Sequence, residues 1–212
     1  MNTLRTVLLI LLLGVVAAQG DETTLRLYWK EGVAAFQRGD YKTGREFLQK
    51  ALELDPNHPI TLVNLGSLEY RDGQLEEAEK HLRKATRVAP ESFAAWMTLG
   101  VVAYEARKDD LALAALAQAV LLEPSNAQAH AYLGVTLGRK GWLDGAEASL
   151  ARAVQLDETS RDAHFNLAVI LLQRNPPSVE LARKHYLRAR ELGAESDSLI
   201  EKQLELSKEK RK

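Results

Sequence analysis

The sequence predicts an all-α fold in which five helical hairpins stack into a solenoid and one further helix caps the C-terminal end. Three observations predict it. Several columns of glycine, alanine and leucine recur with a period of 34 residues, which indicates a helical repeat. Within each period the apolar residues follow the spacing of one helix face. Alanine and leucine dominate the apolar residues, while glycine and proline are few, and this composition favours helix.

The first segment, residues 1–20, differs from the rest of the chain. One positive charge, Arg5, precedes an uninterrupted apolar run, Val7–Ala18, and small residues follow the run. This pattern is typical of a secretory signal peptide that is cleaved after Ala18 or Gly20. The run would span about 18 Å as a helix, which is less than the roughly 30 Å of a bilayer's hydrocarbon core. We therefore expect a periplasmic or secreted protein, and an uncleaved membrane anchor is the alternative.

Two columns set the register of the repeats. Small residues in the first helix of each unit form one column: Gly32, Gly66, Gly100, Gly134 and Ala168. Leucines in the second helix form the other: Leu48, Leu82, Leu116 and Leu150. A small residue that faces the second helix lets the two helix axes approach closely, and the leucines fill the space around that contact. The columns place five repeats within residues 21–196, at about 25–58, 59–92, 93–126, 127–160 and 161–196.

Breaker and cap residues mark where the helices end. Glycine can adopt the left-handed conformation that ends a helix, and it marks the turn inside three units at Gly39, Gly73 and Gly141. Proline withholds a backbone N–H, and it closes three units at Pro56, Pro90 and Pro124. N-cap side chains then open the next units at Ser92, Asn126 and Ser160. His58 breaks this column of caps, but Pro59 follows it and suits the first helical position.

Two places near the C-terminal end depart from the regular period. The fifth repeat fits only with two extra residues at 175–177, which we expect in the turn between its two helices. Residues 197–212 are expected to form a capping helix, which shields the last repeat, and a charged tail. Ser198 and Glu201 have the spacing of a capping box for that helix. The basic residues at 208–212 suit a solvated helix C-terminus.

The third unit resembles a known repeat family almost throughout. Its matching residues are Trp96, Leu99, Gly100, Ala103, Ala112, Leu116, Ala119 and Pro124. These residues resemble the tetratricopeptide repeat family, and the resemblance extends from about residue 25 to residue 196. The first unit departs from the family pattern with Tyr28, Glu31 and Gly44. The resemblance implies a right-handed superhelical solenoid whose first helices line a concave face that binds extended peptides or partner helices.

Composition and motifs argue against several classes of function. The formal net charge is −1, which argues against a nucleic-acid partner, and a membrane contact is expected only if the N-terminal segment is uncleaved. The sequence has no cysteine and no phosphate-binding, dinucleotide or hydrolase motif. The five histidines include no i, i+4 pair, and His130 and His164 are expected to pack against neighbouring helices. Asp109 and Asp110 are expected to complement a helix dipole. We therefore expect no catalytic residues, metal or cofactor.

The first helices instead present an apolar and aromatic strip with a few polar groups, which suits recognition of a protein. The candidate partner-binding residues are Trp29, Lys30, Asn64, Tyr70, Arg71, Met97, Thr98, Tyr104, Tyr132, Arg139, Phe165 and Asn166. Asn64 and Asn166 share one column of the repeat, and an amide there can pair with a ligand's backbone, as asparagines do in the family. The alternative is that much of the strip packs between adjacent units.

The sequence therefore predicts a scaffold or adaptor that acts outside the cytoplasm and binds a partner peptide or helix in its concave groove. The first alternative is a membrane-anchored structural or assembly-factor subunit, which an uncleaved N-terminal helix would hold in place. The second alternative is an enzyme, but the sequence offers no convergent acid, base or nucleophile for one.

Overall fold

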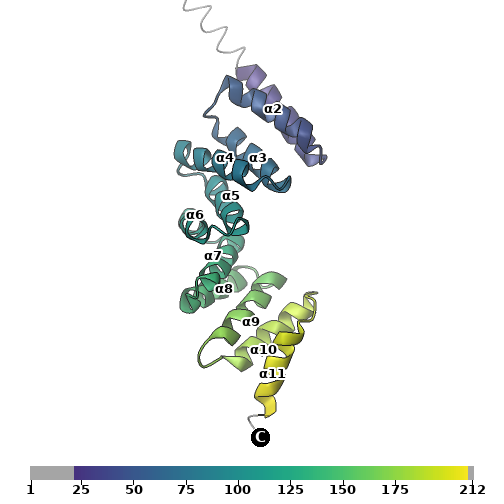
Figure 1. Cartoon of the computed structure of the whole chain (residues 1–212), viewed down its shortest axis with the longest axis vertical. Helices are drawn as coiled ribbons and strands as arrows, with labels where there is room; N and C mark the ends of the chain where they lie inside the picture. The colour runs from purple at the N-terminus through teal and green to yellow at the C-terminus, as the bar shows by residue number, and fades with distance from the viewer. Residues whose placement is uncertain (1–21, 210–212) are drawn as a thin grey trace, which may run out of the picture. The chain divides into compact units, whose positions relative to one another are not determined.

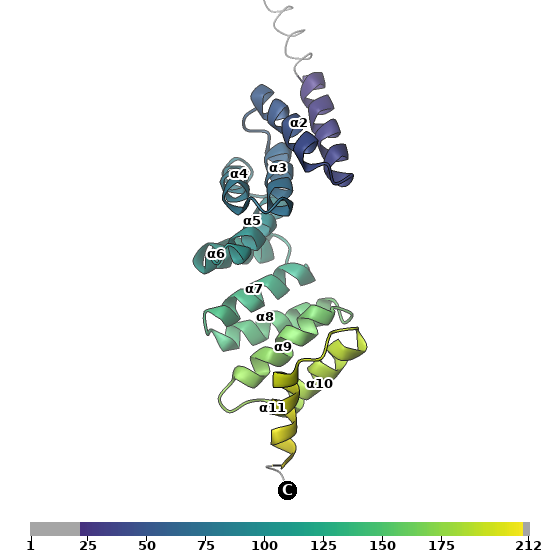
Figure 2. The same ribbon diagram turned by 45° about the vertical axis from the view of Figure 1, so that its right-hand side comes forward.

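The computed structural model describes residues 22–209, and the regular structure in this range is entirely helical (Figures 1 and 2). The predicted all-α fold of repeated helical hairpins is confirmed. The N-terminal segment 1–20 and the end of the charged tail lie outside the described residues. Across residues 22–209, no helix is both long enough and apolar enough to cross a membrane.

Each repeat contributes two helices of about three to four turns. In the first repeat a helix over residues 22–37 is followed by α2, Tyr41–Leu54. The next four repeats and the cap follow in order: α3 Pro59–Arg71, α4 Leu75–Val88, α5 Phe93–Glu105, α6 Asp109–Leu122, α7 Ala127–Arg139, α8 Leu143–Leu156, α9 Arg161–Gln173, α10 Val179–Glu191 and α11 Ser198–Glu209. The two extra residues predicted near 175–177 lie in the turn between α9 and α10.

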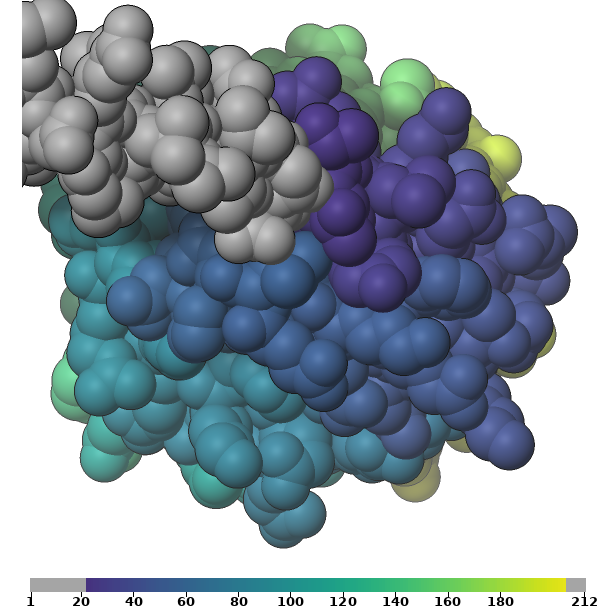
Figure 3. Space-filling view, turned by 90° about the horizontal axis from the view of Figure 1, so that it is seen from above, coloured from purple at the N-terminus to yellow at the C-terminus, as the bar shows by residue number. Residues whose placement is uncertain are grey.

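The helices form two compact units, unit one over Met1–Thr98 and unit two over Leu99–Lys212. In unit one, α3 packs against α2 and α4. Figure 3 looks onto the N-terminal end of this unit, where the helix over residues 22–37 (dark purple) lies at the surface. In unit two, α7 packs against α6 and α8, and the contacts continue from α8 to α9, α10 and α11. Each unit therefore buries its apolar residues between consecutive helices, as stacked hairpins require.

Close approach within the hairpins depends on the glycine column. A Cβ atom on Gly66 would lie 2.6 Å from Leu82 Cγ, and one on Gly134 would lie 2.6 Å from Leu150 Cγ. Both leucines are completely buried, so the leucine occupies the space that a larger residue at the glycine position would need. This is the packing that the two sequence columns predict.

The turns inside the hairpins use a left-handed residue. Gly39, Gly73 and Gly141 have φ values of 79°, 78° and 74°, as predicted. Arg107 occupies the same column of the third repeat and has a φ of 58°. No sequence signal indicated this turn residue, because the left-handed conformation costs an arginine about 1–2 kcal/mol and arginine is therefore not a residue type that marks such a turn.

Three of the predicted N-caps are confirmed, and a fourth is added. Ser92, Asn126 and Ser160 accept hydrogen bonds from the backbone N–H three residues later, at 3.3, 3.0 and 3.3 Å. His58, which the sequence analysis set apart from this column, does the same, because its Nδ1 accepts from the Thr61 N–H at 3.3 Å. An imidazole nitrogen without its proton is an acceptor and can therefore cap a helix as a hydroxyl does.

The C-terminal helix α11 is capped differently from the prediction. Asp197, and not Ser198, is the cap, because its Oδ1 accepts from the N–H groups of residues 199 and 200 at 2.9 and 3.1 Å. Glu201 does not complete a capping box but accepts a hydrogen bond from the Tyr186 hydroxyl at 2.9 Å. The same hydroxyl accepts from the Asp197 N–H at 2.9 Å. Tyr186 on α10 therefore fixes the start of α11, whose Ile200 is buried in the core of the last repeat.

Candidate functional site

A groove with a volume of about 670 Å³ lies in unit two over the first helices of its repeats. The groove is lined by the end of α5, residues 127–135 of α7, the loop after α8 and the start of α9. The groove brings together four of the predicted partner-binding residues, Tyr104, Tyr132, Phe165 and Asn166. The repeat register explains this convergence, because successive first helices present equivalent faces to the same side of a stack.

Aromatic rings form much of the groove wall. The rings of Tyr104 and Tyr132 are 5.8 Å apart between centroids and meet edge to face, with an interplanar angle of 79°. Phe165 packs near Tyr186, with ring centroids 6.3 Å apart. The three groove aromatics are half-buried, so each ring is fixed by packing on one part and exposed on another. Such rigid, partly exposed rings suit the anchors of a protein interface.

Arg139, a predicted partner-binding residue, does not line the groove but supports its wall. Its guanidinium carbon lies 3.7 Å from the Tyr104 ring centroid, and its Nη2 donates to the Tyr104 carbonyl oxygen at 2.9 Å. The same nitrogen forms an ion pair with Asp109. We therefore assign Arg139 a positioning role in place of the predicted ligand contact. Asp109 lies at the start of α6, as expected, and is also the ion-pair partner of Arg139.

Three carboxylates, those of Glu105, Asp157 and Asp162, line the groove together with the rings. Asp157 and Asp162 were not among the residues predicted to line the groove. Asp157 Oδ1 accepts from the Thr159 hydroxyl at 2.7 Å and from the Thr159 N–H at 2.9 Å. These two hydrogen bonds, the hydroxyl first, lower the pKa of Asp157 and keep it ionised. Only their place in the sequence could have indicated this role, since both aspartates lie next to the turn that leads into α9, a helix that lines the groove.

Asn166 is half-buried on α9, where the repeat register placed it. Among the described residues its amide has no hydrogen-bond partner, so both its carbonyl oxygen and its NH₂ can pair with a ligand's backbone. Gln128, exposed on α7, adds a second amide to the groove. These amides are therefore suited to fix the register of an extended chain that lies against the rings.

The remaining predicted residues all belong to unit one. Trp29 lines a small hollow of about 260 Å³ and also packs against the buried Leu48, Leu65 and Leu68. The other side chains differ in exposure: Lys30 and Arg71 are exposed, and Asn64, Tyr70 and Thr98 are half-buried. Met97 is only 8% exposed, which favours a packing role over the predicted partner contact. A long apolar side chain on a first helix can turn toward the core as easily as toward the groove.

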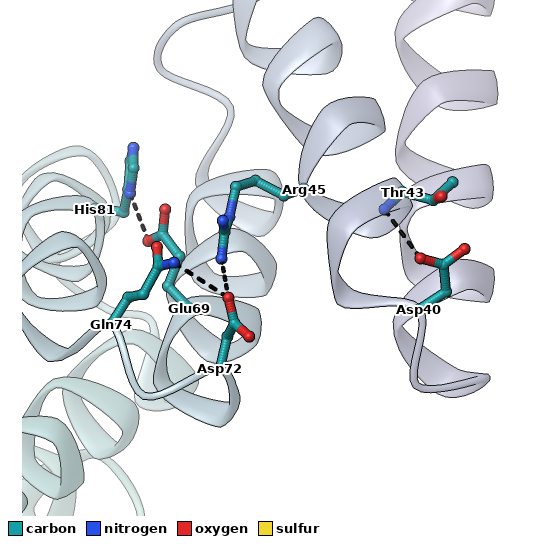
Figure 4. Close-up of polar contacts among 7 residues, drawn as sticks. All are labelled: Asp40, Thr43, Arg45, Glu69, Asp72, Gln74 and His81. Atoms are coloured by element: carbon teal, nitrogen blue, oxygen red, sulfur yellow. Dashed lines mark hydrogen bonds and ion pairs between the residues drawn. The ribbon is translucent and has the colours of Figure 1, made fainter.

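Polar contacts in unit one join consecutive helices (Figure 4). Arg45 Nη2 on α2 lies 2.5 Å from Asp72 Oδ2 at the end of α3. His81 Nδ1 on α4 lies 2.8 Å from Oε2 of Glu69, whose side chain is only 3% exposed. Because each of these polar groups faces a partner on the next helix, we interpret these residues as structural.

Two histidines of unit two form a contact that the sequence did not reveal. His164 Nδ1 and His185 Nδ1 are 2.9 Å apart, and His164 Nε2 lies 3.3 Å from the Glu158 carbonyl oxygen. Burial, and then the charge of His164, lower the pKa of His185. Within residues 22–209, no cluster of three or more potential ligands suits a metal ion. The histidine pair is therefore interpreted as a packing contact of α9 and α10 that responds to protonation.

The Trp96 column has a shared role at the turns between repeats. Trp96 Nε1 donates to the carbonyl oxygen of Pro90 at 2.8 Å, and His130 Nε2 lies 3.0 Å from that of Pro124. His164 makes the third contact of this kind. Tryptophan and histidine can replace each other here because each presents a ring nitrogen to the carbonyl six residues earlier.

Comparison with known protein families identifies the repeat. The chain matches tetratricopeptide repeat profiles over residues 23–91, and over residues 63–120, 110–161 and 136–197. Comparison with curated proteins finds no match.

Many solved structures share the fold, and three of them illustrate the likeness. The structure of MamA from Desulfovibrio magneticus RS-1 is 23% identical, with a TM-score of 0.74, and the match covers 82% of this chain and 98% of that one. YrrB, described as a TPR protein with an unusual peptide-binding site, is 24% identical, with a TM-score of 0.71 and coverage of 85% and 90%. PilF of Pseudomonas aeruginosa is 20% identical, with a TM-score of 0.73 and coverage of 84% and 80%. At these identities the likeness concerns the fold.

Proposed function

This chain belongs to the tetratricopeptide repeat family, and we propose that it is a scaffold that binds an extended segment of another protein in the groove of unit two, outside the cytoplasm. Repeats of this family support a role in protein–protein interaction and a protein or peptide partner. The observation that carries the specific proposal is the groove itself, in which aromatic rings and unpaired amides converge from successive first helices.

The composition of the groove favours a peptide over a small ligand. The wall is open along successive first helices, so an extended chain can contact Tyr104, Tyr132 and Phe165 in turn. The rings that the partner buries supply most of the affinity. The Asn166 amide forms hydrogen bonds with the partner's backbone and so sets the direction in which the peptide chain lies. The similarity in fold to YrrB, which is described as having a peptide-binding site, is consistent with this proposal.

The proposed location rests on the N-terminal segment. The charge, the apolar run and the small residues of 1–20 follow the pattern of a signal peptide. The alternative, a subunit anchored by an uncleaved N-terminal helix, makes a different prediction for the mature chain. N-terminal sequencing of the protein from its producing cell separates the two: a start at Gln19 or Asp21 supports export and cleavage, and an intact Met1 supports the anchor.

A photo-crosslinking amino acid in the groove tests the binding proposal. Ala131 lines the groove on α7, and Ala114 is an exposed alanine on α6 that serves as the matched control. We expect the reagent at position 131 to trap a discrete partner in the producing cell, and the yield to fall when Tyr132→Ala removes a ring from the groove wall. Equal trapping from positions 131 and 114, or trapping that Tyr132→Ala leaves unchanged, would contradict the groove assignment.

A further inference from the structure

We propose that the segment bound in the unit-two groove is basic, an extended peptide in which lysine or arginine side chains alternate with apolar ones. The inference rests on the proposed function, because it names the chemistry of the partner for that same groove. Its basis is the charge of the groove wall, which the family resemblance does not specify.

The wall of the groove carries only negative formal charge. Glu105, Asp157 and Asp162 line it, and its lining includes no lysine, arginine or histidine. The three carboxylates come from the end of α5, the C-cap of α8 and the first turn of α9, respectively. Carboxylates on three separate elements around one groove leave a negative potential that a cationic partner neutralises.

The negative surface continues beside the groove. A neighbouring hollow of about 430 Å³ shares Asp162 and Phe165 with it and adds the carboxylates of Glu195 and Asp197. Its one lining cation is Arg161, whose Nε lies 2.8 Å from Asp162 Oδ1. Three carboxylates against one guanidinium leave this extension negative as well.

The two basic residues at the C-terminal end of α7, Arg139 and its C-cap Lys140, are engaged with acids outside the groove. Arg139 pairs with Asp109 and lies against the Tyr104 ring, with only 18% of its side chain exposed. Lys140 Nζ lies 2.8 Å from Asp110 Oδ1. Neither cation therefore neutralises the groove. Arg161 pairs with only one of its three carboxylates, Asp162, so the charges of Glu105 and Asp157 are left for the partner to match.

The rings and the carboxylates together select a specific kind of basic segment. In an extended chain successive side chains point to opposite sides, so alternate residues can face one wall. Apolar residues can then cover the rings of Tyr132 and Phe165, while lysine or arginine stems lie along the wall and place their charges near the carboxylates. An acidic peptide or a nucleic-acid backbone would bring like charge to the same surface and is disfavoured.

Direct binding measurements test this. Short synthetic peptides in which leucine alternates with lysine, glutamate or glutamine are labelled and titrated with the full chain, and fluorescence anisotropy is measured at low and high salt. We expect the lysine peptide to bind about tenfold more tightly than the glutamine peptide, with the glutamate peptide weakest, and the preference to shrink as salt rises.

Matched charge variants locate the effect. Glu105→Gln and Asp162→Asn should each weaken the lysine peptide by roughly two- to fivefold, the range of an exposed ion pair. The control is Glu76→Gln together with Glu77→Gln on α4 of unit one, which removes two exposed acids and should leave the affinity unchanged. A control that weakens binding as much as the groove variants would overturn the assignment.

The outcomes separate the two proposals. If all three peptides bind alike and Tyr132→Ala weakens each of them, the groove binds peptides without regard to charge, and only the basic-partner inference fails. If no peptide responds to Tyr132→Ala, the proposed function fails and the inference with it. Self-association of the chain that Glu105→Gln abolishes would place a second copy in the groove and would also overturn the inference.

Discussion

Replacing Gly66 by alanine tests the packing on which every hairpin depends. A Cβ atom at this position would lie 2.6 Å from Cγ, 3.0 Å from Cδ2 and 3.2 Å from Cδ1 of Leu82. Leu82 is completely buried and cannot move into solvent. Overpacking of this kind costs about 1–3 kcal/mol, and the gain in helix propensity from glycine to alanine returns about 0.5–1 kcal/mol. We expect Gly66→Ala to lower the free energy of unfolding by up to about 2.5 kcal/mol.

Combining Gly66→Ala with Leu82→Ala tests whether the two positions are in contact. Leu82→Ala alone should cost about 2–5 kcal/mol, because it leaves a cavity in the core. The three atoms nearest to the new methyl group all belong to the part of Leu82 that this change removes. Gly66→Ala should therefore stabilise the Leu82→Ala background, and the double variant should lose about 1–3 kcal/mol less than the sum of the single losses.

Urea unfolding followed by circular dichroism measures the four members of this cycle. Gly145→Ala on α8 is the control, because its nearest neighbour, Leu137 Cδ1, would lie at an ordinary 3.4 Å, and we expect it to gain about 0.5–1 kcal/mol. Additive losses for Gly66 and Leu82, within about 0.5 kcal/mol, would show that the two positions do not meet and would refute the proposed packing.

Three other perturbations test separate features. Arg107→Gly should stabilise unit two by about 1 kcal/mol in urea unfolding, because glycine adopts the left-handed turn without strain; a loss of stability would contradict this. The pKa of His185 lies below its usual 6.5, so the unfolded chain takes up the proton first and stability should fall as the pH drops below about 6.5. Thermal melts on both sides of that pH should show a smaller fall for His185→Gln, and an equal fall would count against the histidine pair. Tyr186→Phe removes two hydrogen bonds at the start of α11 and should cost about 1–2 kcal/mol, with faster amide exchange in α11; unchanged exchange would mean that the hydroxyl does not fix that helix.

Periodic features of the chain could be predicted from the sequence, because a repeat reports the same local structure several times. The glycine and leucine columns predicted the close contacts of the hairpins, and Ser92, Asn126 and Ser160 predicted three helix starts. Turn and cap residues could not be predicted at positions where the residue type departs from its column but the backbone geometry is kept. Arg107 adopts the left-handed turn of its column, and an imidazole caps α3 at His58.

Polar contacts between side chains of different helices that do not recur with the repeat could not be predicted. Arg139 reaches Asp109, 30 residues away, and His164 meets His185, 21 residues away, and neither pair recurs with the repeat. The aromatic part of the groove followed from the register of the first helices. The carboxylates of Asp157 and Asp162 did not, because Asp157 lies in a turn, where the direction of a side chain has no periodic signal, and Asp162 lies in the first turn of α9 beside it.

Amide chemical-shift mapping of the full chain with the leucine–lysine peptide tests the central claim most directly. We expect shifts that saturate with added peptide to gather at Tyr132, Phe165 and Asn166, the residues that line the groove. Leu121 and Leu187 lie exposed on second helices of the same unit and should not respond. Shifts that centre on these two leucines and leave the groove unchanged would contradict the account.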